Sequence, residues 1–247
     1  MLLRLFSKLL CVFLLGAAAI GHAQQSTLRV AVIEDSPPLS YIDTDGKLAG
    51  FNVALAEALC AEMKVKCTFG LTRLENLIDD VAAGAFDLGA LGFLVTPERQ
   101  KKVVFTQPVY RSTTLWLAKP GILPGEKKVR ISTFRGSLQE KYIKAKGWDS
   151  ISADTYTEFI EQFSAGVTNA MVAPLMTAVA LQREPRFLAL GIVATSLRVP
   201  ELEGDACYVI NPKRADLKEK LDKALIAVRE QGGFARINTQ YLPLRIN

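Results

Sequence analysis

Strand-like and helix-like segments alternate along most of this chain, and that alternation limits the folds open to it. The stretch 28–33 is apolar enough for a strand, and apolar residues then recur at helical spacing over 74–82, ahead of Gly84. Apolar stretches at 86–95, 103–105 and 115–118 indicate further strands. A β-α-β-α succession of this kind predicts an α/β fold built on mostly parallel sheets.

The second half of the chain continues the alternation. Ser137 with Glu140, and Thr155 with Glu158, have the spacing of capping boxes, in which two side chains satisfy backbone N–H groups at a helix start. Both pairs therefore predict helix starts. The other expected elements are short strands and one long helix, at 129–131, 170–172, 206–210 and 217–228.

Residues 1–23 have the features of a secretory signal peptide. Arg4 and Lys8 precede an apolar run at 9–20, and Ala23 ends a small-x-small cleavage pattern. The run is too short to span a bilayer, so we expect cleavage after Ala23 and no stable membrane insertion afterwards. The expected mature chain is periplasmic and has 224 of the 247 residues.

Cleavage also changes the chemistry open to the mature chain. It removes His22, the only histidine, so a Ser-His or Cys-His nucleophile, a histidine base and a histidine metal site are excluded. We therefore expect no enzyme activity, no metal and no cofactor. Loss of Arg4 and Lys8 leaves 28 basic and 25 acidic side chains, a charge of +3 without a basic block. This charge argues against a nucleic-acid partner.

Three cysteines remain after cleavage. Cys60 and Cys67 are separated by six residues, and export places them in an oxidising compartment. They form either a disulfide between a helix end and the next strand or two buried free thiols. Cys207 lies in the apolar run 206–210 and is expected to be a buried, unreactive thiol.

Short motifs follow one another along the mature chain in a characteristic order. They are Pro37-Pro38-Leu39-Ser40-Tyr41, Asp45-Gly46-Lys47-Leu48-Ala49-Gly50-Phe51-Asn52-Val53, Ala83-Gly84-Ala85-Phe86-Asp87, Thr96-Pro97-Glu98-Arg99, Phe105-Thr106-Gln107-Pro108-Val109-Tyr110, Gly136-Ser137 and Gly232-Gly233-Phe234. In order and spacing they resemble the signatures of family 3 bacterial solute-binding proteins, the periplasmic receptors for polar amino acids. The spacing of Cys60 and Cys67 also resembles that of receptors in this family, which implies the disulfide.

The resemblance implies a two-lobed fold of the type II periplasmic-binding-protein kind. Lobe 1 would comprise 24–112 and 211–247, and lobe 2 would comprise 113–210. The chain would cross between the lobes near 112–116 and near 207–211, and a hinge motion would close the cleft over a small-molecule ligand. The implied partner is the permease of an ABC importer, and the receptor is expected to be a monomer.

By the same resemblance, Arg99 holds the carboxylate of the ligand. A guanidinium presents a planar fork of donors that matches a carboxylate, and the pair is strong when desolvated. The alternative is a surface arginine paired with Glu98 or Asp87. Backbone donors from Gly92 and Ser137 would share the carboxylate, unless Ser137 is only a helix cap.

Five leucines and a proline depart from the family pattern at expected ligand-binding positions. Aromatic side chains are replaced by Leu39 and Leu74, hydroxyl-bearing ones by Leu91, Leu94 and Leu138, and the aspartate that grips the α-ammonium by Pro174. A buried ammonium without a carboxylate is unfavourable. Either Glu34 or Asp35 supplies the missing negative charge, or the ligand has no ammonium at that point. The alternative interpretation of Glu34 and Asp35 is that they belong to a solvated loop.

Three functions follow from these residues. The main expectation is an ABC-importer receptor for a small carboxylate with an apolar body, which binds the common polar amino acids weakly. The alternative is a periplasmic sensor or accessory binding protein without a transport role. An enzyme on the same scaffold, such as a dehydratase, is disfavoured because histidine and an evident acid pair are absent from the mature sequence.

Overall fold

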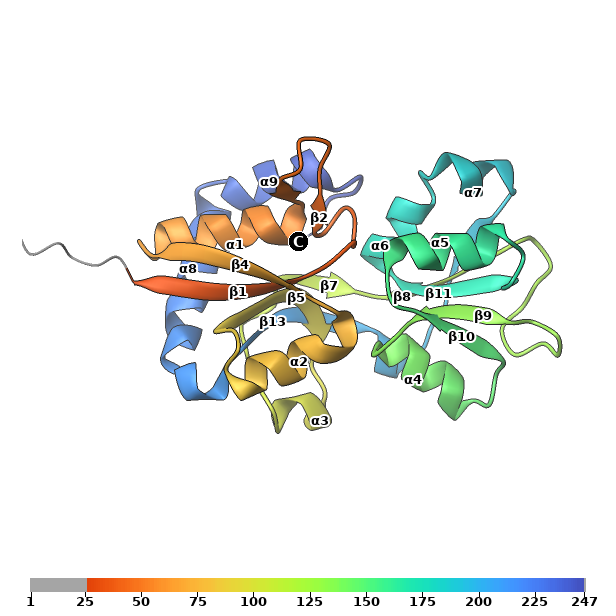
Figure 1. Cartoon of the computed structure of the whole chain (residues 1–247), viewed down its shortest axis with the longest axis horizontal. Coiled ribbons are helices and arrows are strands. Elements are labelled where there is room, and N and C mark those ends of the chain that lie inside the picture. Colours follow the sequence, from red (N-terminus) through yellow and green to blue (C-terminus); the bar gives the residue numbers. More distant parts are fainter. Residues whose placement is uncertain (1–25, 247) are drawn as a thin grey trace, which may run out of the picture.

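Two β-sheets, each flanked by helices, form two lobes that lie side by side (Figure 1). This computed structural model describes residues 26–246. The signal peptide predicted at 1–23 therefore lies outside the described residues. The two-lobed α/β architecture expected from the sequence is confirmed.

The sheet of lobe 1 contains parallel and antiparallel strands. Its strands are β1 (Thr27–Ile33), β4 (Lys66–Thr72), β5 (Leu88–Leu94), β6 (Val104–Phe105), β7 (Tyr110–Ser112) and β13 (Gly204–Ile210). The order is β4-β1-β5-β13-β6, with β7 also paired to β13. β1 is parallel to β4 and β5, whereas β13 is antiparallel to its partners. A small hairpin, β2 (Tyr41–Ile42) and β3 (Leu48–Ala49), stands apart from this sheet.

Helices cover both faces of the lobe 1 sheet. One face carries α1 (Phe51–Glu62), α8 (Asp216–Glu230) and α9 (Gly233–Tyr241), which pack against one another, and the opposite face carries α2 (Leu74–Ala83) (Figure 1). The short α3 (Pro97–Gln100) follows β5. Because both faces are covered, four consecutive residues of β1, Val30 to Ile33, are buried without alternation.

Lobe 2 has the same layered construction. Its strands, in sheet order, are β10 (Ser150–Ala153), β9 (Ile131–Phe134), β11 (Ala170–Pro174), β8 (Thr114–Ala118) and β12 (Val193–Ser196). Its helices are α4 (Leu138–Ala145), α5 (Tyr156–Ser164), α6 (Leu175–Leu181) and α7 (Pro185–Ala189), with a 3-10 turn at Pro200–Leu202 near the return to lobe 1. A second 3-10 turn, at Pro212–Arg214, follows β13 in lobe 1. Met171 and Ala173 join the apolar cluster of α5 and α6, while Ala170 and Val172 join that of α4. The sheet therefore has two buried faces.

The chain crosses between the lobes twice. It enters lobe 2 between β7 and β8, near Ser112. It returns between Ser196 and Gly204, because β13 pairs with β5 inside the lobe 1 sheet. The boundary expected at 210 would assign this strand to lobe 2. An apolar run predicts a strand but not its partner, and we propose 113–203 as the extent of lobe 2.

Both predicted capping boxes form. The Ser137 hydroxyl accepts a hydrogen bond from the backbone N–H of Glu140 at 3.0 Å, and Thr155 does the same for Glu158 at 3.1 Å. The carboxylate of Glu140 returns to the N–H of Gly136, one residue before the cap. These contacts fix where α4 and α5 begin, and both helix starts face the other lobe across the cleft.

Cys60 and Cys67 form the expected disulfide, which joins the end of α1 to β4. Cys207 is buried in β13, and burial raises the pKa of its thiol to about 11. A thiol with such a pKa is almost entirely protonated at neutral pH, so Cys207 is unreactive there, as the sequence predicts.

Candidate ligand-binding site

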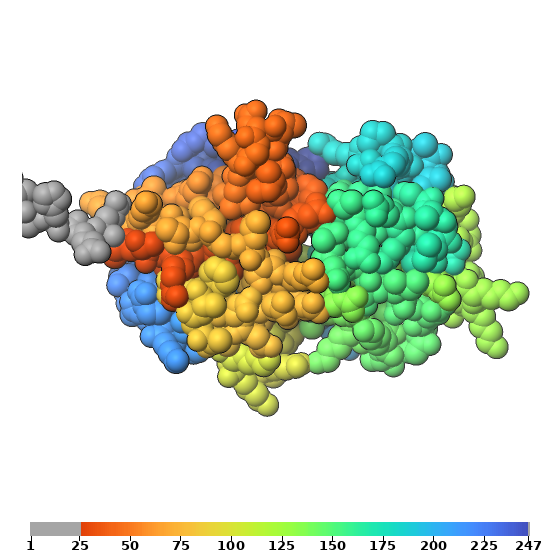
Figure 2. Space-filling view, viewed as in Figure 1, coloured from red at the N-terminus to blue at the C-terminus, as the bar shows by residue number. Residues whose placement is uncertain are grey.

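A cavity of about 90 Å³ lies between the two lobes. Figure 2 shows the lobes meeting along the middle of the molecule, with the residues near 35 and 75 against those near 135 and 155. The cavity is lined by Ile33, Asp35, Ser36, Leu39, Leu74, Leu91, Gly92, Phe93, Leu94, Arg99, Tyr110, Ser112, Phe134, Ser137, Leu138, Gln139, Asp154, Thr155, Pro174, Met176 and Thr177. Most of these side chains are apolar.

The structure brings together all but one of the residues that the sequence predicts for the ligand site. The exception is Glu34, which is exposed and does not line the cavity. The residues in the cavity are Arg99, Gly92, Ser137, Asp35, Leu39, Leu74, Leu91, Leu94, Leu138 and Pro174.

Arg99 is held at the cavity by the start of α3. The Thr96 hydroxyl caps this short helix by accepting from the backbone N–H of Arg99 at 3.2 Å. One guanidinium nitrogen donates to the carbonyl of Leu94 at 3.0 Å, and the guanidinium packs 4.8 Å from the centre of the Phe93 ring. These contacts aim the side chain but leave most of its donors uncommitted.

The charge of Arg99 has no ion-pair partner within residues 26–246. Burial lowers the pKa of Arg99 to about 10, so the guanidinium remains charged at neutral pH. The expected alternative partners lie elsewhere, since Glu98 pairs with Lys141 and Asp87 pairs with Arg29. A half-buried cation without an ion-pair partner beside a cavity attracts an anion.

The start of α4 contributes further donors, but not the one that the sequence predicts. The backbone N–H of Ser137 donates to the Phe134 carbonyl at 3.1 Å, and its hydroxyl oxygen caps the helix. Only its hydroxyl hydrogen remains for a ligand. The N–H groups of Leu138 and Gln139 follow in the first turn, where a helix leaves such groups without internal partners.

Gly92 lies in the part of β5 that is no longer paired with β1. β5 pairs with β1 only at Leu88 and Gly89, so the later residues of β5 border the cavity instead of β1. Parallel sheets bind ligands at the carboxyl ends of their strands, where such a divergence opens space. This position is consistent with a backbone donor at Gly92, as the sequence predicts.

The two acids of the cavity are already engaged. The Asp35 carboxylate accepts from the backbone N–H of Thr157 at 2.9 Å, and the Asp35 carbonyl accepts from Tyr156 at 3.1 Å. This acid therefore caps the N-terminus of α5 across the cleft, where the helix dipole favours negative charge. Glu34 lies outside the cavity, and an ammonium would have to share Asp35 with the start of α5.

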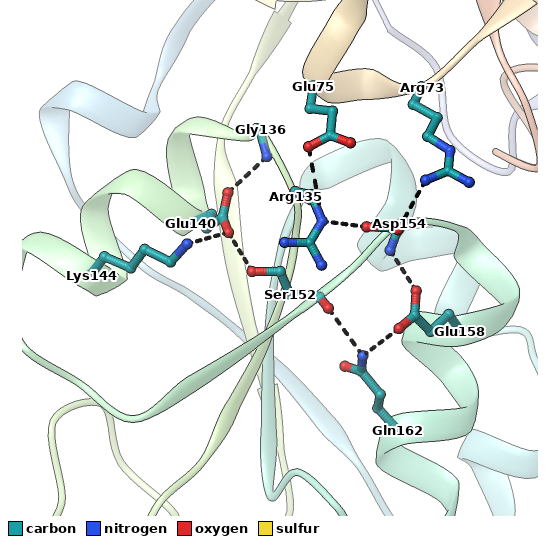
Figure 3. A network of polar contacts seen from close by, with 10 residues as sticks. All are labelled: Arg73, Glu75, Arg135, Gly136, Glu140, Lys144, Ser152, Asp154, Glu158 and Gln162. Carbon is teal, nitrogen blue, oxygen red and sulfur yellow. Dashed lines mark hydrogen bonds and ion pairs between the residues drawn. The ribbon is translucent and has the colours of Figure 1, made fainter.

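Asp154 is the second acid, and Figure 3 shows its surroundings. Its carboxylate pairs with Arg73 of lobe 1 at 3.2 Å and with Arg135 of lobe 2. Arg135 in turn reaches Glu75 of lobe 1 at 3.9 Å. A Cβ at Gly136 would lie 2.5 Å from the Cα of Glu75, so the lobes touch where only glycine fits.

The model of bacterial extracellular solute-binding proteins, family 3, matches residues 28–243. The chain belongs to this family. It is similar to ABC transporter arginine-binding protein 1 of Escherichia coli (strain K12), with 27% identity over 243 residues that cover 96% of this chain and 99% of that protein. It is also similar to the L-arginine-binding protein of Pseudomonas aeruginosa, with 26% identity over 92% of this chain and 95% of that protein.

Solved structures support the fold of this family 3 protein. An ancestral arginine-binding protein bound to arginine matches with a TM-score of 0.77 and 24% identity, covering 88% of this chain and 98% of that one. A histidine kinase sensor domain with similarity to periplasmic binding proteins matches with a TM-score of 0.77 and 20% identity, covering 90% and 99%. At these identities the likeness establishes the fold alone.

The apolar wall of the family 3 cavity comes from both lobes. Leu39 and Leu91 of lobe 1 are 5% and 8% exposed, and Pro174 of lobe 2 lies opposite at the junction of β11 and α6. Met176 of α6 packs with the apolar core of lobe 1. Pro174 therefore makes an apolar contact and brings no acid to the position where the family pattern has the ammonium-binding aspartate.

Sequence reasoning missed several lining residues of this receptor. Gln139 donates from its amide to the Thr114 hydroxyl at 2.8 Å, and no described residue donates to its side-chain oxygen. The position of Gln139 just after Ser137, at a predicted helix start, could have indicated that it lines the cavity. Tyr110 belongs to a recognised motif, but no sequence pattern indicates that its hydroxyl reaches the cavity. Asp154 was missed because its partners are distant in sequence.

Residues 26–246 contain no helix that is both long and apolar enough to cross a membrane. The same residues contain no cluster of histidine, cysteine, aspartate and glutamate side chains suited to hold a metal ion.

Proposed function

We propose that this family 3 solute-binding protein is a periplasmic receptor that captures a small carboxylate between its lobes and delivers it to an ABC importer. The observation that carries the proposal is the half-buried guanidinium of Arg99, which lines the cavity without an ion-pair partner among the described residues. A carboxylate would complete its fork of donors, with further N–H groups from the start of α4. The names of the relatives, which are arginine-binding proteins of ABC transporters, support the transport role.

We further propose that the preferred ligand has an apolar body and no ammonium beside its carboxylate. Pro174 brings no charge to the cavity, and the carboxylates of Asp35 and Asp154 are bound by α5 and by two arginines. An ammonium buried there would have to share Asp35 with the start of α5 and Asp154 with two arginines, which is unfavourable. Apolar side chains from both lobes suit an aliphatic or aromatic body instead.

We infer that the protein binds its ligand without transforming it, as a monomer and without a cofactor. The relatives are named as binding proteins, and the acids of the cavity are held in ion pairs or helix caps instead of standing free as general bases. No observation favours the alternative of a sensor or accessory protein, because the sensor-domain match concerns the fold alone.

Calorimetry on the mature protein tests the proposal. The titrants are short and branched aliphatic acids, phenyl-substituted acids, and the amino acids arginine, lysine, histidine, glutamine and glutamate. We expect an apolar acid to bind best. Arg99→Ala should weaken that binding by at least about thirty-fold, or roughly 2 kcal/mol. The matched control is Arg130→Ala, because the guanidinium of Arg130 pairs with Asp149 within lobe 2, away from the cavity.

Two results would contradict the proposal. Sub-micromolar binding of one of the five amino acids would return the chain to the ordinary amino-acid receptors. Equal affinity in Arg99→Ala and Arg130→Ala would remove Arg99 from the site. Recovery of the protein from a periplasmic extract, with residues 1–23 removed, is the matching test of its location.

A further inference from the structure

The hydroxyl of Tyr110 is a buried polar group that the proposed carboxylate site does not use. Tyr110 begins β7, is 5% exposed, and lines the cavity. Its ring is fixed by an edge-on contact with Phe51, with centroids 6.4 Å apart. No described residue hydrogen-bonds to its hydroxyl. The neighbouring Tyr208 contrasts with it, since that hydroxyl donates to the side chain of Asn52 at 3.0 Å.

Gly92 explains how this hydroxyl reaches the cavity. A Cβ at position 92 would overlap the Tyr110 hydroxyl oxygen and lie 2.6 Å from the ring carbon that bears it. The hydroxyl thus occupies the space that a side chain at 92 would fill. Leu91, Gly92 and Leu94 carry no polar side chain, so Tyr110 supplies the side-chain hydroxyl along this edge of β5.

The hydroxyl and the Arg99 guanidinium flank the same short segment of β5. Tyr110 lies against Gly92, while Arg99 packs on Phe93 and bonds to the carbonyl of Leu94. Both residues line the same cavity, so a small ligand whose carboxylate meets Arg99 can also be reached by Tyr110.

Tyr110 is also neutral. Burial raises the pKa of its hydroxyl well above the usual range, so the O–H keeps its proton at all physiological pH values. A neutral hydroxyl does not neutralise the charge of an ammonium, whereas it can donate a hydrogen bond to an uncharged oxygen. Leaving such a donor unmet in a desolvated cavity is unfavourable.

We propose that the Tyr110 hydroxyl donates a hydrogen bond to an uncharged oxygen on the carbon next to the ligand carboxylate. The preferred ligand is then an α-keto or α-hydroxy acid with an apolar body. This inference rests on the proposed function, in which Arg99 holds the carboxylate. Tyr110 is the residue that distinguishes such an acid from the parent acid, which lacks the oxygen, and from the corresponding amino acid.

Matched ligand pairs test this inference. For butanoate, a branched six-carbon acid and phenylpropanoate, calorimetry compares each parent acid with its α-keto and α-hydroxy derivatives. The unmodified protein should bind the best oxygenated acid about tenfold more tightly than its parent. Tyr110→Phe should abolish that preference and leave the affinity for the parent within about twofold. Tyr142→Phe, which removes the hydroxyl of a tyrosine packed on Trp148 away from the cavity, should change neither.

The comparison within the unmodified protein needs no variant, so a folding defect in Tyr110→Phe does not obscure the result. Equal affinity for parent and oxygenated acids would overturn the inference and leave the carboxylate site intact. A Tyr110→Phe variant that loses affinity for both by the same factor would also overturn it, because the tyrosine would then act through packing. Failure of all the acids to bind would instead reject the proposed function and this inference together.

Discussion

Charged side chains are arranged differently at the rim of the cleft and in its interior. At the rim, lobe 1 and lobe 2 exchange ion pairs: Arg73 with Asp154, Glu75 with Arg135, and Glu98 with Lys141. In the interior, Arg99 faces the cavity without an acidic partner among residues 26–246. The rim satisfies its own charges when the lobes meet, whereas the interior is complete only with an anion from outside.

The two arrangements also differ in their energetics. The rim pairs are between about a quarter and two-thirds exposed, so each contributes little to stability and is screened by salt. Arg99 is desolvated, so its charge is costly until a carboxylate meets it and strongly stabilising afterwards. We therefore expect Arg99 in the interior to determine the ligand affinity, and the rim pairs to affect how the closed lobes sit against each other.

The largest expected effect separates binding from stability at Arg99. Arg99→Met keeps an unbranched side chain, although a shorter and apolar one, and removes the charge, so carboxylate binding should fall by at least about thirty-fold. The free energy of unfolding of the unliganded protein should nevertheless rise, by about 1 kcal/mol, because a buried unpaired charge is gone. Urea unfolding without ligand measures this. A clear fall in stability would show that the interior charge is already compensated.

An acid placed in the interior should reverse the ligand preference. In Pro174→Asp the new carboxylate faces the cavity, competes for Arg99 and repels the ligand carboxylate, so affinity for apolar acids should fall about tenfold. Binding of α-amino acids should improve over the unmodified protein because their ammonium gains an acceptor.

The control for this substitution is Pro174→Asn, because asparagine has nearly the same shape as aspartate and carries no charge. Calorimetry with one apolar acid and its amino acid on both variants gives the comparison. If the two variants behave alike, the missing proline ring, and not the charge, sets the preference.

The smallest expected effect belongs to the rim. Asp154→Asn removes the acid that two arginines share, one from each lobe, and should weaken ligand binding about two- to fivefold at low salt. At about 1 M salt that difference should shrink, because exposed charges are screened within roughly 3 Å. Asp149→Asn, which disrupts a pair within lobe 2, should leave affinity unchanged. A salt-independent loss in Asp154→Asn would move this acid from the rim to the ligand site.

Local signals in the sequence predicted much of the fold. The helical stripe at 74–82 and the stop at Gly84 became α2, whose C-cap glycine has a positive φ of 92°. Both capping boxes formed because each needs only residues four apart or fewer. The pairing of β13 with β5 was not predictable in this way, since it joins segments more than a hundred residues apart.

The residues of the candidate site also differ in whether local sequence signals predict them. Arg99 and the apolar wall were predictable because they stand at fixed places in short motifs. The engagement of Asp35 with the start of α5, and of Asp154 with Arg73, depends on how the lobes meet. No local pattern encodes contacts between residues 81 or 122 positions apart. Sequence alone therefore named Asp35 as a candidate without revealing its contact with α5, and it missed Asp154.

The place of β13 in the lobe 1 sheet also determines the order in which the chain acquires its structure during synthesis. β5 has β1 on one side and waits for β13 on the other, and β13 begins only at Gly204. Lobe 2, whose strands and helices form one uninterrupted stretch, is complete before its neighbour. Until the last part of the chain emerges, β5 presents a bare edge that invites pairing with other nascent chains. The lobe 1 sheet can therefore be completed only after the whole stretch that forms lobe 2 has emerged.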